Sequence, residues 1–164
     1  MVQVRVSGVA LDEAGQHVLL LKPIDDLPGV GTMLPIWIGP LEATSILIAI
    51  EGAASPRPLA HDLIGALLDA TGSTLDSVEV TRIEDGTYYA ELTLQTPEGA
   101  RVVDARPSDA VAVAARTSAP LWVADEVMAE AGIPDLLADE SETEERVDEF
   151  KRFLNDVDPE DFRG

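Results

Sequence analysis

A strand is predicted to meet a helix at Asp104-Ala105-Arg106-Pro107-Ser108-Asp109-Ala110. A strand is predicted over residues 100–105, and an apolar helix to about Thr117 follows. Pro107 suits the first position of a helix, because the backbone N–H that it lacks would have no partner there and its φ is already helical. Asp109 then falls at the third helical position, where a carboxylate faces the positive end of the helix dipole.

The same pattern occurs earlier in the chain, at Ile38-Gly39-Pro40-Leu41-Glu42-Ala43. In both places a strand is followed by one residue, a proline, one residue, an acid, an alanine and an apolar helix. Glu42 therefore matches Asp109, and each acid would stabilise its helix start by about 0.3–1 kcal/mol. Alternatively, the two carboxylates come from related units and converge on one site. The pattern itself is compatible with both interpretations.

The remaining elements are predicted from the spacing of apolar residues and from the turn residues that separate the apolar segments. Strands are predicted at 2–10, 16–22, 32–38, from Val78, at 88–95, 100–105 and 121–123; helices are predicted from Pro40, at 60–70 and 107–117, with a short helix ending near Gly132. We predict an α+β fold with a mixed, largely antiparallel sheet and packed helices, built from two weakly similar strand-Pro-helix units. The helix from Pro40 is apolar nearly all round, so we expect it to be buried.

The chain has 164 residues and 46% hydrophobic residues, enough for one domain with a packed core. Its 31 acidic and 11 basic residues give a net charge of −20. This charge argues against nucleic-acid binding by bulk electrostatics and against attraction to an anionic membrane. The lack of cysteine excludes disulfides, a thiol nucleophile and cysteine-based zinc sites. The first residues do not resemble a signal peptide and no apolar run is long enough to span a bilayer, so we expect a cytoplasmic protein.

The acidic residues gather near the C-terminus. Residues 125–164 hold 15 acidic and 4 basic residues. We predict a body at 1–137 and an acidic, helical tail at 138–164. Ser141-Glu142-Thr143-Glu144 has the capping-box pattern, and Val147, Phe150 and Leu154 follow at helical spacing. The tail helix either docks on the body or a sister subunit, or forms an arm that contacts a protein partner.

Several polar residues lie at the predicted helix starts. His61 could act as a general base near neutral pH or be an ordinary exposed histidine at a helix start. Asp104 and Arg106 are two apart on a predicted strand and so share a face. They would form either a structural ion pair or a metal ligand beside a phosphate contact. Ser108 lacks the context of a nucleophile and reads as a helix-start hydroxyl.

Four stretches together resemble the bifunctional nuclease domain family over about residues 1–135. They are Leu34-Pro35-Ile36-Trp37-Ile38-Gly39, Glu42-Ala43, Arg57-Pro58-Leu59-Ala60-His61-Asp62-Leu63 and Asp104-Ala105-Arg106-Pro107-Ser108-Asp109-Ala110. One departure is Ala60, where we expect a threonine that would cap the helix. The resemblance implies an α+β domain that assembles as a homo-oligomer. Some members of the family cut both DNA and RNA, so the resemblance also implies nuclease activity.

The resemblance brings no catalytic set, so the site is a hypothesis from the residues. It assigns His61 as base, Asp62, Asp104 and Asp109 as metal ligands or water-orienting groups, Glu42 as a further acid, Arg57 and Arg106 as phosphate contacts, and Ser108 as a further substrate contact. Mg²⁺ or Mn²⁺ would be held by Asp104 and Asp109, because hard cations prefer carboxylates. The substrate would be nucleic acid. The alternative is a non-catalytic regulatory or interaction domain in which the same residues stabilise the fold.

Self-association is a separate prediction. Two nearly all-apolar helices in a small body leave little room to bury both within one subunit. We therefore expect a homo-oligomer, with a dimer favoured.

Overall fold

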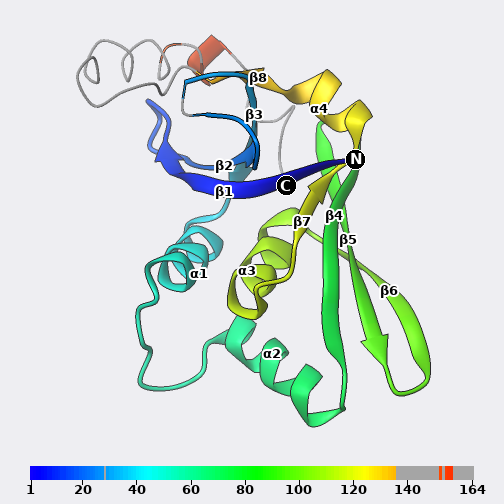
Figure 1. Cartoon of the computed structure of the whole chain (residues 1–164). Coiled ribbons are helices and arrows are strands. Elements are labelled where there is room, and N and C mark those ends of the chain that lie inside the picture. The colour runs from blue at the N-terminus through cyan, green and yellow to red at the C-terminus, as the bar shows by residue number, and fades with distance from the viewer. Residues whose placement is uncertain (28, 136–151, 153, 157–164) are drawn as a thin grey trace.

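The structure is a computed structural model of the chain, and it describes residues 1–27, 29–135, 152 and 154–156. In this part the strands form one eight-stranded sheet in the order β6-β5-β4-β7-β1-β2-β3-β8 (Figure 1). The strands are β1 (Val2–Leu11), β2 (His17–Pro23), β3 (Thr32–Ile38), β4 (Thr74–Glu84), β5 (Thr87–Thr96), β6 (Gly99–Ala105), β7 (Leu121–Val123) and β8 (Ile133–Pro134). Neighbouring strands are antiparallel except β4 and β7, which are parallel.

Tight turns explain most of this topology. The β1–β2 connection turns at Gly15, whose φ of +77° favours glycine, and β4 passes into β5 through Asp85 and Gly86, both with positive φ. A two-residue turn can join only antiparallel neighbours. The mixed, largely antiparallel sheet predicted from the sequence is therefore confirmed.

The helices are α1 (Pro40–Glu51), α2 (Ala60–Ala70), α3 (Pro107–Thr117) and α4 (Asp125–Ala131). Both predicted proline starts are confirmed: Gly39 precedes α1 and Arg106 precedes α3, each in extended conformation. α3 contacts α1 on one side and α2 on the other, and it also packs on β4 and β5 (Figure 1). The first turns of the three helices thus come from separate parts of the chain but lie in one layer.

The main core lies between this helix layer and the sheet. It combines alternate strand residues such as Leu19, Ile36, Val78 and Leu92 with the buried face of α3. β2 is buried on both faces, because Val18 and Leu20 belong to a second cluster that includes Leu154. Leu154 of the predicted tail stripe is therefore packed on the sheet. Val147, Phe150 and the capping box at 141–144 lie outside the described residues.

One expectation about the helices is wrong. α1 is not buried all round, since Leu41 and Ile50 are exposed and only Ala43, Ser45 and Ile46 are buried. In α2 the leucine-rich side faces solvent: Leu63 and Leu67 are 53% and 56% exposed, whereas His61 is buried. Periodicity identifies the two faces of a helix, but it does not say which of them the neighbouring helix contacts.

Candidate functional site

A polar network joins α1, α2 and α3, and His61 lies at its centre. Its Nδ1 is 2.7 Å from the hydroxyl of Ser45 on α1, and its Nε2 is 2.9 Å from Oδ1 of Asp109 on α3. The side chain of His61 is 11% exposed and that of Asp109 is 35% exposed. The imidazole is therefore held between two helices, with its carboxylate partner on the solvent side.

The hydrogen bonds of Ser45 indicate which nitrogen of His61 carries the proton. Nη2 of Arg116 donates to Oγ of Ser45 over 3.0 Å. The hydroxyl hydrogen of Ser45 then points to Nδ1 of His61, which accepts it, and Nε2–H donates to Asp109. In this arrangement each hydrogen bond in the series Arg116–Ser45–His61–Asp109 has one donor and one acceptor.

Arg106 connects the two carboxylates of the repeated strand-Pro-helix pattern. Its Nε donates to Oδ2 of Asp109 over 3.0 Å, and its Nη2 donates to Oε1 of Glu42 over 2.9 Å. These partners raise the pKa of the Arg106 guanidinium, the Asp109 hydrogen bond most of all. Glu42 and Asp109 keep their places in the first turns of α1 and α3, and they also converge on one guanidinium.

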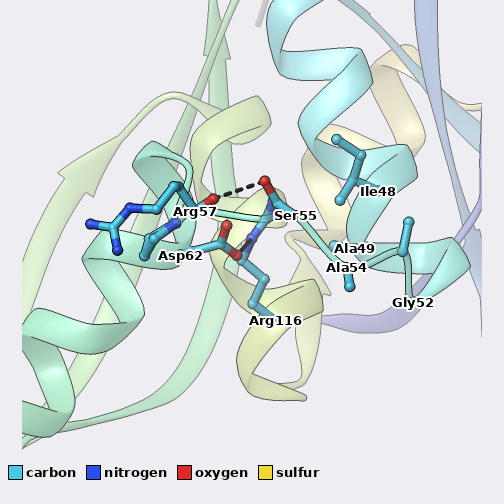
Figure 2. A pocket seen from close by; sticks show the side chains of 10 residues that line it. Ile48, Ala49, Gly52, Ala54, Ser55, Arg57, Asp62 and Arg116 are labelled. Atoms are coloured by element: carbon cyan, nitrogen blue, oxygen red, sulfur yellow. Dashed lines mark hydrogen bonds and ion pairs between the residues drawn. The ribbon is translucent and has the colours of Figure 1, made fainter.

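Arg116 is the second arginine of the network, and it lies deeper, with a side chain 10% exposed. Its Nε donates to Oδ1 of Asp62 over 2.6 Å, and its Nη groups also donate to the backbone oxygens of Ser45 and Ala112. The backbone N–H of Leu59, first, and then Arg116 lower the pKa of the Asp62 carboxyl. Figure 2 shows Asp62 and Arg116 facing one another.

Arg57 lies beside this pair without joining it. It belongs to the loop between α1 and α2, which borders a pocket of about 450 Å³ together with Asp62 and Arg116. Figure 2 shows its guanidinium pointing away from those two side chains. Ser108 is 1% exposed in the first turn of α3, so it faces the core rather than a substrate.

Asp104 lies on the other face of the sheet. In the antiparallel ladders it pairs with Glu91, which pairs with Glu79, whereas its neighbour Val103 pairs with Leu92. Opposite residues in such ladders share a face, and Leu92 belongs to the core under the helices. Asp104 therefore points away from the helix layer. The sequence-based pairing of Asp104 with Arg106 fails because β6 ends at Ala105 and Arg106 turns toward α1 and α3.

Within the described residues, no group of three or more histidine, aspartate or glutamate side chains could hold a metal ion. Of the two predicted metal ligands, Asp109 is engaged by His61 and Arg106, and Asp104 lies on the opposite face. These residues do not fit a metal site as they are arranged, and we derive no step through one.

Sequence reasoning missed Ser45 and Arg116. Ser45 directly precedes the apolar run 46–50 of α1, and a hydroxyl at a buried helical position needs a partner. That signal was present in the sequence. Arg116 had none, because its role depends on the way α3 packs between α1 and α2.

Ala60, where a capping threonine was expected, is the first residue of α2, and Leu59 occupies the cap position. The N–H of Leu59 donates to Oδ2 of Asp62 over 2.8 Å. The helix start is therefore stabilised by Asp62, and a threonine at position 60 would not be its cap.

The chain matches the bifunctional nuclease domain family over residues 20–135. An uncharacterized protein of Mycobacterium tuberculosis (strain ATCC 25618 / H37Rv) is 41% identical over 170 residues, which cover 100% of this chain and 99% of the relative. Bifunctional nuclease 1 of Oryza sativa subsp. japonica is 26% identical over 143 residues, 85% of this chain and 42% of the plant protein. Bifunctional nuclease 1 of Arabidopsis thaliana is 27% identical over 119 residues, 71% of this chain and 36% of the plant protein. The whole network described above lies within the matched range.

Proposed function

Because this chain belongs to the bifunctional nuclease domain family, we propose that it hydrolyses phosphodiester bonds of DNA and RNA with low sequence specificity. The observation that carries the proposal is the pairing of the His61 imidazole with the Asp109 carboxylate, directly beside the exposed guanidinium of Arg106. Such a group can move a proton at the same place where a phosphate is bound.

The proposed reaction is attack of water on phosphorus, which breaks the P–O bond to one sugar; the sugar oxygen that leaves takes up a proton from solvent. Asp109 is the member of the pair that water can reach, so its carboxylate orients the water and takes up its proton as general base, while Nε2–H of His61 holds the carboxylate in place. Ser45 and Arg116 are positioning residues, because they fix the imidazole from its buried side. Glu42 acts through Arg106, whose orientation it fixes.

Arg106 is the proposed phosphate contact. Its side chain is 57% exposed, and two carboxylates hold the guanidinium in one orientation. Nε and Nη2 are engaged by these carboxylates, so Nη1 is the nitrogen that would donate to a phosphate oxygen. Arg57 extends from the neighbouring loop and would contact a more distant phosphate of the same strand.

Dependence on Mg²⁺ or Mn²⁺ stays a prediction. A divalent ion would reduce the repulsion between a polyanion and a chain with a net charge of −20. A cleavage assay with a chelator, and with the ion added back, tests this prediction without assuming where the ion binds.

The direct test uses homogeneous protein and end-labelled single-stranded DNA and RNA of mixed sequence. We expect cleavage of both, at many positions, by an activity that elutes with the chain through successive columns. Asp104→Asn, on the opposite face of the sheet, should cleave like the wild type. Cleavage that separates from the chain during purification would contradict the proposal.

The alternative is a non-catalytic regulatory or interaction domain. The observation in its favour is that Glu42, Asp62, Asp109, Arg106 and Arg116 are paired with one another, which is also how a purely structural network looks. Three acids and two arginines leave this group with a net negative charge, which repels phosphate. In this case substitutions in the network would lower stability, and no cleavage would be found at any stage.

We also propose that the chain self-associates through the outward face of α2, as a dimer. This face carries Leu63, Ile64 and Leu67, all exposed in the single chain. Apolar side chains on consecutive helical turns are typical of interfaces. Light scattering after size exclusion should give twice the chain mass for the wild type and a lower mass for Leu63→Glu. A monomeric wild type at micromolar concentration would contradict the proposal.

Among the described residues, every helix is too short or too polar to cross a membrane.

A further inference from the structure

A second hollow lies next to the network and takes no part in it. It has a volume of about 420 Å³ and is lined by the turn Gly15–His17 and by the segment Trp37–Pro40. The hollow therefore lies where β2 begins, β3 ends and the chain enters α1. Its volume is in the usual range of pockets that bind small organic groups.

One carboxylate separates this hollow from the proposed phosphate contact. Gly39 lines the hollow, and a Cβ atom placed on it would lie only 2.3 Å from Oε2 of Glu42. The other oxygen of that carboxylate accepts the hydrogen bond from Arg106. A group bound in the hollow and a phosphate on Arg106 would thus lie on the two sides of Glu42, close enough to belong to one nucleotide.

The lining favours a flat, uncharged ring. None of the lining residues is acidic, although the chain carries 31 acidic residues. The side chain of His17 lies on the helix side of the sheet, because it alternates with Val18, which faces the second cluster. The imidazole ring offers a flat face for stacking, and Gly15, where an added Cβ would have no atom within 4 Å, leaves its side of the hollow open.

One wall of the hollow is held in place from the far face of the sheet, where the side chain of Trp37 packs in the second cluster. Trp37 is 3% exposed, and its indole N–H donates to Oδ2 of Asp12 over 3.0 Å. The other oxygen of Asp12 accepts the backbone N–H of Gln16, which fixes the turn that forms the opposite wall. A ligand would therefore meet walls that are already in place, so little ordering is needed on binding.

From these observations we propose that the hollow binds the base of the nucleotide whose phosphate contacts Arg106, by stacking on His17. The inference rests on the proposed function, because it takes a nucleic-acid strand as the ligand. It adds a base-binding subsite that does not read sequence, since every base has a flat face.

Binding can be measured without turnover. The chain has two tryptophans, so Trp122→Phe leaves Trp37 as the only one, and its fluorescence reports on the turn that lines the hollow, because its indole N–H is bonded to Asp12 in that turn. The probes are adenosine 5′-monophosphate and ribose 5-phosphate, which carry the same phosphate and differ in the base. We expect adenosine 5′-monophosphate to change the fluorescence at concentrations where ribose 5-phosphate does not.

Variants of the same Trp122→Phe protein identify the stacking residue. His17→Ala should raise the dissociation constant for adenosine 5′-monophosphate about tenfold, or about 1.4 kcal/mol. His17→Phe, which keeps a ring, and Gln95→Ala, an exposed control on β5, should stay within about twofold of the parent. Urea unfolding of each variant checks that it is folded.

Two results would overturn the inference. One is an equal response to both probes, and the other is a folded His17→Ala protein that binds adenosine 5′-monophosphate like its parent. If the parent cleaves nucleic acid but shows either result, only the base-binding subsite is wrong. If the parent binds as expected but never cleaves, the nuclease proposal fails and the subsite stands as a nucleotide-binding site.

Discussion

Asp109→Asn removes the charge that joins His61 to Arg106 while keeping the size of the side chain. In the wild type, Oδ1 accepts from Nε2 of His61 over 2.9 Å and Oδ2 accepts from Nε of Arg106 over 3.0 Å. Asparagine has only one oxygen, so its amide group must face one of these two donors. Either the imidazole or the guanidinium therefore loses its acceptor.

The expected loss of stability is moderate. Hydrogen bonds to charged groups contribute about 1.5–3 kcal/mol, but Asp109 and Arg106 are 35% and 57% exposed, and water screens their attraction. We expect the free energy of unfolding to fall by about 1–2 kcal/mol. For a chain of this size, that is a decrease of about 2–8 °C in melting temperature.

The expected loss of activity is much larger. Without the carboxylate, the attacking water loses the group that orients it and accepts its proton, so cleavage should slow by about 10²–10⁴-fold. The measurements are urea unfolding and cleavage of a labelled single-stranded oligonucleotide, with Asp76→Asn, an exposed acid on β4, as the matched control. Folded Asp109→Asn protein that cleaves within twofold of the control would refute the reasoning.

Three further predictions concern stability. Lys22→Met leaves the Asp135 carboxylate buried without its ammonium partner, so the free energy of unfolding in urea should fall by about 3–5 kcal/mol. A fall below about 1 kcal/mol would count against this interpretation. The pKa of Asp62 is lowered in the folded state, so its stabilisation is present above the ordinary value of 3.8 and is lost as the pH falls below it. Asp62→Asn should therefore flatten the dependence of the unfolding free energy on pH in this range. An unchanged dependence would argue against the pairing with Arg116. Burial, and secondarily Glu130, raises the pKa of the Tyr88 phenol, so stability should fall as the pH rises above 10.0, and Tyr88→Phe should remove that part of the fall in alkaline unfolding curves.

The parts of the fold that could be predicted depend on local chemistry. Pro40 and Pro107 fix helix starts through their own backbone geometry, and Asp85-Gly86 fixes a hairpin in the same way. These features need no knowledge of the rest of the chain. Their predicted positions agree with the structure.

The candidate site could be predicted only in part, because it depends on packing between distant segments. The repeated pattern suggested that Glu42 and Asp109 converge, and both contact Arg106. The pattern could not place Asp104, whose face depends on the register of β6 against β5. It could not reveal Ser45 or Arg116 either, because their contacts to His61 and Asp62 exist only once the three helices are packed together.

The central claim, that the His61 network makes this chain a nuclease, is tested most directly by one side-by-side assay. Wild type and His61→Ala, each purified to homogeneity and shown by circular dichroism to be folded, are incubated with single-stranded DNA and RNA in the presence of Mn²⁺ or a chelator. We predict that the wild type cleaves both substrates and that His61→Ala cleaves at least about 100-fold more slowly. A folded His61→Ala protein that cleaves at the wild-type rate under the same conditions would contradict the claim.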